Sequence, residues 1–403
     1  MILLKKNKKL AAWSLLLFIL IIPMGAFADD IYEGTSNIPV FSESVEASVP
    51  VEPPKIDAGS AIVMDAMTGR ILYEKDAYSK KPMASTTKIM TAILAIEHGN
   101  LDDMVTVSKR AAAIGGSTIH LRAGEKLSLR DLLYGLMLNS GNDAAIAIAE
   151  HIGGTVERFA EMMTEKARQL GAKNTNFKTP HGLDNPDHYS TAYDLALITR
   201  YALGNETFNQ IVRTQTAQIQ GRSLYNTNEM LDLYPGADGV KTGYTSKAGR
   251  CLVTSATRGN RRYISVVLNC SSRTARAKSS RSILDYAFDN YKMYTLVKIN
   301  DVLARVPVIK GIRKDISILP VDEIHLPLRE DEVENLKAQI DLPDQFHAPV
   351  DSGIEVGSIK YVVNGKVIAS TSLKTGPGVR RKEFFDYFLQ VIEQWVKSVR
   401  ISG

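Results

Sequence analysis

Residues 81–98 read Lys-Pro-Met-Ala-Ser-Thr-Thr-Lys-Ile-Met-Thr-Ala-Ile-Leu-Ala-Ile-Glu-His, and they contain the first of three motifs on which the interpretation rests. Its apolar residues recur with helical spacing, which predicts a helix over Thr86–His98 that starts just after Ser85. Residues three apart share one face of a helix, so Lys88 is expected beside Ser85. A hydroxyl next to an amine is a candidate nucleophile with its base, whereas either residue alone would be an ordinary helix cap or surface lysine.

Two further short motifs follow along the chain, Ser140-Gly141-Asn142 and Lys241-Thr242-Gly243. Taken alone, each has a common structural explanation, since Ser and Asn cap helices and glycine-rich turns often lead into strands. Taken together with the first motif, they add a second hydroxyl, an amide and a cationic strand. A second Lys374-Thr375-Gly376 has no predicted strand after it and is set aside.

The three motifs can be assigned complementary chemical roles. A lysine acts as a base only when its pKa is lowered by desolvation or by nearby cations, and Lys241 would be such a cation for Lys88. Ser140 is predicted to relay a proton toward the leaving amine, and Asn142 to hold Lys88 and bind the substrate amide. Further predicted substrate contacts come from the strand, where Thr242 offers a hydroxyl, Gly243 leaves room for a peptide to lie alongside, and Tyr244 supplies a backbone N–H to the oxyanion.

The N-terminus has the pattern of a secretory signal. Four lysines precede an apolar run over 10–22, and Ala26-Phe27-Ala28 resembles a cleavage site. The alternative is an uncleaved anchor, but the run is short for the roughly 20 residues that a span needs. We expect residues 1–28 to be a removed signal peptide and the protein to act outside the cytoplasmic membrane.

Residues 379–401 are predicted to form an amphipathic helix. Its polar residues are too frequent for a membrane span, but an aromatic face with basic flanks is typical of helices that lie on anionic membrane surfaces. The alternative is a helix that packs on its own protein. The apolar face comprises Phe384, Phe385, Phe388, Ile392, Trp395, Val396 and Val399.

Composition limits the remaining possibilities. A formal net charge of +5 over 403 residues does not suggest nucleic-acid binding. Cys251 and Cys270 flank a predicted hairpin and are expected to be small buried hydrophobes, with a bridge left as the alternative. No His/Cys cluster has metal-ligand spacing, so neither a metal nor a cofactor is expected.

The chain divides by character into several parts. Residues 29–55 are rich in Pro, Ser, Val and Glu and are predicted to be a linker. Residues 56–296 mix strands with helices, which predicts an α/β layered catalytic domain. Residues 297–376 contain short alternating segments and an Asn364-Gly365 turn signal, which predict a small all-β domain that acts as a spacer.

The motifs, in this order, resemble those of low-molecular-mass penicillin-binding proteins, the serine-type D-alanyl-D-alanine carboxypeptidases of peptidase family S11. The likeness covers about Ile56 to the C-terminus. It extends to the segments Thr179-Pro-His-Gly-Leu183, His188-Tyr-Ser-Thr-Ala192, Asn226-Thr-Asn228 and Tyr234-Pro-Gly-Ala-Asp-Gly-Val-Lys-Thr-Gly-Tyr244.

This resemblance implies a β-lactamase/transpeptidase-like catalytic domain, with helices packed on an antiparallel sheet, followed by a β-rich domain and an amphipathic tail. It implies removal of the terminal D-Ala from peptidoglycan pentapeptide stems through an acyl-serine intermediate, and covalent inhibition by β-lactam antibiotics. By the match, Ser85 is the nucleophile, Lys88 the base and Lys241 a substrate binder. Arg276 falls where the family has an arginine that can pair with the substrate's terminal carboxylate, although Arg273 lies close by.

Three other functions are possible alternatives for a chain of this kind. A β-lactamase commonly has S-D-N as its second motif and needs a water-activating carboxylate, but here the middle residue is Gly141 and no convincing E-x-x-L-N loop is found. A D,D-endopeptidase acting on cross-links would need no different residues. An inactive wall-binding scaffold is disfavoured because Ser85, Lys88, Ser140 and Lys241 are all present.

Overall fold

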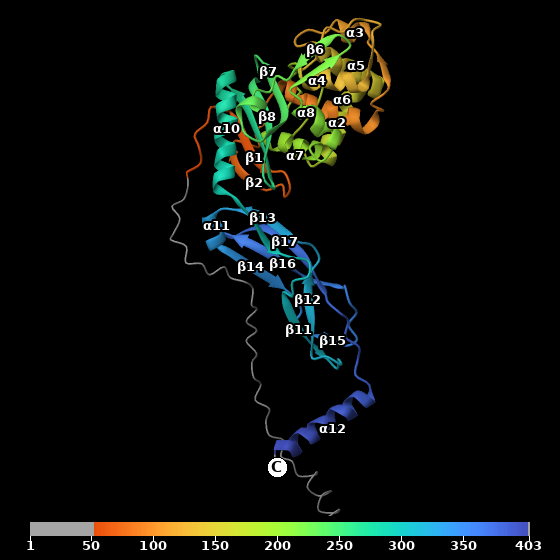
Figure 1. Cartoon of the computed structure of the whole chain (residues 1–403), viewed down its shortest axis with the longest axis vertical. Coiled ribbons are helices and arrows are strands. Elements are labelled where there is room, and N and C mark those ends of the chain that lie inside the picture. Colours follow the sequence, from red (N-terminus) through yellow and green to blue (C-terminus); the bar gives the residue numbers. More distant parts are fainter. Residues whose placement is uncertain (1–51, 402–403) are drawn as a thin grey trace, which may run out of the picture. The chain divides into compact units, whose positions relative to one another are not determined.

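The computed structural model describes residues 52–401. The predicted signal peptide and most of the predicted linker lie outside these residues. Figure 1 shows the helices and strands with their labels.

A five-stranded antiparallel sheet forms the centre of the catalytic domain, in the order β2-β1-β9-β8-β7. In the β1–β2 hairpin Ala61 pairs with Lys75, and in the β7–β8 pair Lys241 lies opposite Val253. The long, nearly continuous apolar runs of the middle strands fit a sheet that is covered on both faces. The bounds are β1 Ser60–Asp65, β2 Ile71–Lys75, β7 Ala237–Thr245, β8 Gly249–Arg258 and β9 Arg261–Cys270.

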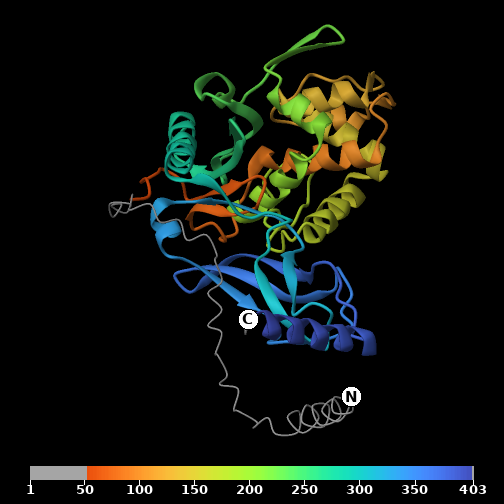
Figure 2. The ribbon, with the colours of Figure 1, turned by 60° about the horizontal axis from the view of Figure 1, so that its bottom comes forward.

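Helices cover the two faces of this sheet (Figures 1 and 2). Helix α10 (Arg273–Asn290) packs on one face, where Tyr263 of the sheet lies at a ring-centroid distance of 4.5 Å from Phe288. Helices α2 (Lys88–His98), α7 (Ala192–Ala202) and α8 (Glu206–Arg213) pack on the other face. The predicted α/β layered domain is therefore confirmed.

A helical region extends from the second face. Helix α5 (Asn142–Gly153) is buried from Asn142 to Ala149, as expected for a helix that is apolar on all sides and surrounded by others. Helix α8 and the β5–β6 hairpin have no clear signal in the sequence. The remaining bounds are α3 Lys109–Ala112, α4 Leu129–Met137, α6 Val156–Gln169, α9 Met230–Leu233, β3 Met104–Thr106, β4 Lys126–Ser128, β5 Thr216–Ile219 and β6 Arg222–Tyr225.

The β-rich domain contains a six-stranded sheet in the order β14-β16-β17-β12-β11-β15 and a β10–β13 pair. The Asn364-Gly365 turn joins β16 to β17, and both residues have positive φ, as a tight hairpin turn requires. The bounds are β10 Lys292–Val297, β11 Ala304–Ile309, β12 Asp315–Pro320, β13 Ile324–Leu328, β14 Leu336–Asp341, β15 Phe346–His347, β16 Glu355–Val363 and β17 Lys366–Thr375.

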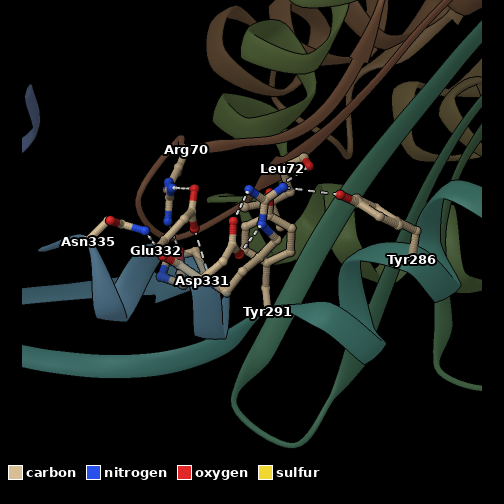
Figure 3. A network of polar contacts seen from close by, with 9 residues as sticks. Arg70, Leu72, Tyr286, Tyr291, Asp331, Glu332 and Asn335 are labelled. Atoms are coloured by element: carbon tan, nitrogen blue, oxygen red, sulfur yellow. Dashed lines mark hydrogen bonds and ion pairs between the residues drawn. The ribbon is translucent and has the colours of Figure 1, made fainter. Parts of the chain in front are cut away.

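A polar network joins the β1–β2 turn and the end of α10 to helix α11 (Glu330–Glu334) (Figure 3). Arg70 Nη2 lies 2.6 Å from Glu332 Oε1, and both side chains are nearly buried. Tyr291 donates to the carbonyl oxygen of Leu72 at 2.9 Å, and Arg329 lies 3.3 Å from the Tyr286 hydroxyl. Because the buried charges are paired, this network avoids the penalty of an isolated buried ion.

The C-terminal helix α12 spans Phe384–Ile401 and therefore starts later than residue 379. The residues just before α12 are held to the β-rich domain by backbone contacts. Val379 pairs with Val350, and Arg381 pairs with Gly311. The N–H of Lys382 donates to the carbonyl oxygen of Lys310, the residue after β11. Within residues 52–401, no helix is both long and apolar enough to cross a bilayer.

Candidate active site

Ser85 lies in a short 3₁₀ turn, Ala84–Thr87, that runs directly into α2. The sequence predicted an α-helix from Thr86, whereas α2 starts at Lys88. The turn is tight: Ala84 has a φ of +48°, and the Thr86 hydroxyl donates to the carbonyl oxygen of Met83 at 2.6 Å. Ser85 is partly exposed while Lys88 is fully buried, so a substrate can reach the hydroxyl but water has little access to the amine.

Lys88 Nζ has three polar contacts. It lies 3.0 Å from Ser85 Oγ, 2.7 Å from Asn142 Oδ1 and 2.7 Å from the carbonyl oxygen of His181. The amide and carbonyl oxygens can only accept hydrogen bonds. If Lys88 is neutral, they take both of its hydrogens, and the nitrogen lone pair is left for the Ser85 hydroxyl proton.

The surroundings of Lys88 favour this neutral form. Burial lowers its pKa well below the ordinary value, and the cation of Lys241 lowers it further, while Asp143 acts in the opposite direction. The Asp143 carboxylate accepts N–H bonds from Ile119 at 3.0 Å and Leu121 at 3.1 Å. It is therefore engaged with backbone donors near the site, which limits its pull on the lysine proton.

The loop 179–183 supplies the third contact of Lys88. Thr91 donates to the carbonyl oxygen of Pro180 at 2.6 Å, which fixes the loop on α2. Gly182 is required, because its φ is +88° and a Cβ there would lie 2.0 Å from the carbonyl oxygen of Ala84. Burial lowers the pKa of His181 to about 3, so the imidazole stays neutral.

His188 makes a supporting contact behind the nucleophile turn. Its Nδ1 accepts the N–H of Lys178 at 2.9 Å, so Nε2 carries the hydrogen that it shares with Thr87 Oγ1 at 2.7 Å. Burial lowers the pKa of His188 to about 4. The neutral ring thus supports the turn that carries Ser85. The sequence singled out this segment and the 179–183 loop only through family resemblance, since a backbone carbonyl ligand leaves no residue-type signature.

The second motif lies at the start of α5. Ser140 is buried and has a φ of +62°. Asn142 is the first residue of the helix, and its side chain bridges Lys88 and the carbonyl oxygen of Gly115, to which Nδ2 donates at 2.8 Å. This contact uses one of the two amide hydrogens, so Asn142 holds Lys88 as predicted and can offer the other hydrogen to a substrate.

Strand β7 carries the third motif and is the last strand in the sheet order. Burial, followed by the Arg276 cation, lowers the pKa of Lys241 to about 7. The Thr242 hydroxyl lies 2.8 Å from that of Thr227. Tyr244 is half exposed, with the Arg250 guanidinium stacked 3.7 Å from its ring centre.

Gly243 is also needed for packing within the protein. A Cβ at this position would lie 3.0 Å from the Ser85 nitrogen and 3.1 Å from Ala84 Cβ. The missing side chain therefore lets β7 pack against the nucleophile turn. The packing brings the backbone of Tyr244, one residue on, close to the same turn.

Arg276 is not a free cation in this structure. Its Nε and Nη2 lie 2.9 and 2.8 Å from the two carboxylate oxygens of Glu229, which the sequence analysis did not single out. Arg273 lies 3.9 Å from the same carboxylate but is largely exposed. Of the two candidate arginines, Arg276 is the buried one.

The arrangement combines a reachable hydroxyl, a desolvated amine and a second buried cation, which is the equipment for acyl transfer through serine. Within the described part of the chain, no group of His, Cys, Asp and Glu side chains could hold a metal ion. Cys251 and Cys270 are free and buried, and burial raises their thiol pKa values to about 11 and about 12. Neither thiol is therefore a nucleophile near neutral pH.

Comparisons with known proteins agree with this chemistry. Residues 47–272 match the family model of D-alanyl-D-alanine carboxypeptidase, and residues 291–381 match the penicillin-binding protein 5 C-terminal domain. The D-alanyl-D-alanine carboxypeptidase DacF of Bacillus subtilis is 36% identical over 85% of this chain and 90% of its own length. DacD of Escherichia coli is 34% identical over 84% of this chain and 92% of its own length.

Solved structures show the same likeness. Penicillin-binding protein 5 from Haemophilus influenzae aligns with a TM-score of 0.73 and 32% identity, over 82% of this chain and all of that one. A mutant form of the Streptomyces K15 DD-transpeptidase aligns with a TM-score of 0.57 and 39% identity, over 59% of this chain and 99% of that one.

Proposed function

The chain belongs to the D-alanyl-D-alanine carboxypeptidase family, and from this premise we propose that Ser85 is the residue acylated by peptidoglycan stem peptides and by penicillin. In the acylation step, Ser85 Oγ attacks the carbonyl carbon of the penultimate D-Ala, and its proton passes to neutral Lys88. Backbone N–H groups of Ser85 and Tyr244 receive the oxyanion. The C–N bond then breaks, and the leaving nitrogen of the terminal D-Ala takes a proton relayed through Ser140.

Deacylation follows the same path in reverse. Water attacks the acyl carbon, Lys88 accepts a proton from it, and the ester bond to Ser85 Oγ breaks as the serine regains its proton. Lys241 and Thr242 bind the substrate along β7, and Arg276 receives its terminal carboxylate. One observation carries this proposal: Lys88 Nζ lies 2.7 Å from each of two oxygen acceptors, which would take both hydrogens of a neutral amine and leave its lone pair for Ser85.

The direct test is release of D-alanine. Purified protein incubated with a D-Ala-D-Ala pentapeptide should release the free amino acid, and the Ser85→Ala variant should not. A cross-linked muropeptide dimer in the same assay distinguishes carboxypeptidase from endopeptidase action, since both would use Ser85. Absence of D-alanine release by the wild-type protein would contradict the proposal.

We also propose that the mature protein is exported and attached to the outer face of the cytoplasmic membrane through α12. The signal-like residues 1–28 support export. On α12, the side chains of Phe384 and Phe385 are 76% and 74% exposed, and Phe388 is 52% exposed. A helix with exposed aromatic side chains and basic neighbours favours an anionic lipid surface, where its apolar face is buried among the headgroups.

A further inference from the structure

The pair Glu229–Arg276 lies beside the substrate strand and is almost shielded from solvent. The side chain of Arg276 is 5% exposed and that of Glu229 is 10% exposed. Two donors of the guanidinium meet the two carboxylate oxygens at 2.9 and 2.8 Å. An arginine binds a free C-terminal carboxylate with the same paired geometry.

The backbone that carries Glu229 is fixed next to the catalytic strand. The N–H of Thr227 donates to the carbonyl oxygen of Leu138 at 3.1 Å, and the Thr227 hydroxyl lies 2.8 Å from that of Thr242 in β7. Glu229 follows two residues later, at the N-terminus of α9. Because the segment is held on both sides, rotation of the Glu229 side chain is the simplest way to release Arg276.

We propose that Glu229 is a specificity-determining residue, whose carboxylate occupies Arg276 in the free enzyme and competes there with the terminal carboxylate of the substrate. This rests on the proposed function, in which Arg276 receives that carboxylate. Two carboxylates repel each other at one buried guanidinium, so substrate binding requires the Glu229 contact to break. The enzyme therefore prefers a peptide with a free C-terminal carboxylate over its C-terminal amide less strongly than it would if Arg276 were unpaired.

The charges around the pair also indicate that removing Glu229 strengthens binding of the substrate carboxylate. Arg276 is close enough to Lys241 to lower its pKa. The Glu229 carboxylate offsets the charge of Arg276, so removing it leaves two buried cations close together without this anion. In a Glu229→Gln variant, the substrate carboxylate becomes the compensating anion, and it should bind more tightly.

The experiment compares two peptides that share the scissile bond, an acyl-D-Ala-D-Ala with a free carboxylate and the same peptide as its C-terminal amide. For the full-length mature protein, we expect kcat/KM for the carboxylate to exceed that for the amide by less than about tenfold. Glu229→Gln should raise this ratio by about a further tenfold, mainly through a lower KM for the carboxylate peptide. The matched control is Glu206→Gln, which changes a carboxylate whose side chain is 82% exposed and should leave the ratio unchanged.

Two results would overturn the proposal: a wild-type ratio of about 10 or more, or a Glu229→Gln ratio equal to or below that of the wild type. In an Arg276→Gln background, the effect of Glu229→Gln should disappear, and its persistence would also contradict the proposal. If Glu229→Gln does not fold, the wild-type ratio alone decides. Wild-type protein that cleaves neither peptide and is not acylated by penicillin would contradict the proposed function itself, which distinguishes that failure from failure of the Glu229 assignment.

Discussion

Lys88 Nζ lies 3.0 Å from Ser85 Oγ, although Ser85 belongs to a 3₁₀ turn and Lys88 is the first residue of the α-helix that follows. The change of helix type places the serine where a substrate can reach it and leaves the lysine buried. Burial disfavours the charged amine, and the two fixed oxygen acceptors orient the neutral one. This pair is the basis of the predictions that follow.

Replacing Lys88 by Ala should abolish acylation, because the serine proton then has no adjacent acceptor. We expect the second-order rate of penicillin acylation to fall by about 10³-fold or more. Stopped-flow or gel-based labelling with a fluorescent penicillin measures this rate. The control Lys173→Ala removes an exposed lysine and should label normally. Near-normal labelling of Lys88→Ala would exclude Lys88 as the base.

The plot of kcat/KM against pH should be bell-shaped. Its maximum should lie at lower pH than for two lysines with ordinary pKa values. Lys88 must be neutral, and its pKa is lowered well below 10.5, so activity rises as this group loses its proton. Lys241 must be protonated, and its pKa is lowered to about 7, so activity falls from about there upward. Because the two lysines are coupled, the apparent pKa values of the rising and falling limbs of the profile belong to the pair and not to either residue alone. A profile that stays flat up to about pH 10 would contradict this account.

Replacing Lys241 by Arg should cost activity even though the charge is kept. The pocket is fully buried around a compact ammonium, and a planar guanidinium has a different shape and hydrogen-bond geometry. We expect kcat/KM for D-Ala-D-Ala peptides to fall by about 100-fold or more. Circular dichroism should show an unchanged fold. Activity within about twofold of wild type would show that only charge at this position matters.

A methyl group at Gly243 should impair catalysis through geometry alone. The new Cβ would lie 3.0 Å from the Ser85 nitrogen, so either β7 or the nucleophile turn must shift. Displacements of this kind cost up to about 100-fold in rate, and we expect Gly243→Ala to acylate about 10- to 100-fold more slowly. Cys251→Ala, on the neighbouring strand opposite Gly243, is the control and should keep its acylation rate. Equal rates for wild type and Gly243→Ala would show that the close contact does not constrain Ser85.

Truncation after Lys382 should release the protein from membranes while leaving the β-rich domain whole, because Val379 and Arg381 are paired with that domain. The truncated protein should cleave small D-Ala-D-Ala peptides at the wild-type rate but should not sediment with anionic vesicles. The double variant Phe385→Glu, Phe388→Glu should also bind weakly, because it puts two charges on the exposed apolar side chains of α12.

The control for this double variant is Tyr225→Glu, which places the same charge at an aromatic residue exposed elsewhere. It should sediment like the wild type. Equal sedimentation of the wild-type and truncated proteins would show that α12 is not the membrane anchor.

Much of this structure follows from local patterns in the sequence. The sequence predicted the strand at Lys241 and the hairpin between Cys251 and Cys270, and helical periodicity predicted α2. The exact ends of the helices were less predictable. The turn at Ser85 is a 3₁₀ turn, and Gly182 and Gly243 contact its backbone closely. Such tertiary contacts leave no local signal in the sequence.

The site was predictable where side chains carry the chemistry and unpredictable where the backbone or a distant partner does. Ser85 and Lys88 form a motif, whereas the His181 carbonyl that binds Lys88 could be any residue type. Glu229 was missed because its role depends on pairing with Arg276, 47 residues away in the chain. A separation of this length forms no recognisable sequence motif.

The most direct test of the account is to locate the acyl group by mass spectrometry after reaction of the mature protein with penicillin. We predict one adduct per molecule, on the peptide that contains Ser85, and no adduct in Ser85→Ala. The lysine-dependent mechanism further predicts that Lys88→Ala forms none on the same timescale. An adduct on Ser140, or persistent labelling of Ser85→Ala, would contradict the assignment of Ser85 as the nucleophile.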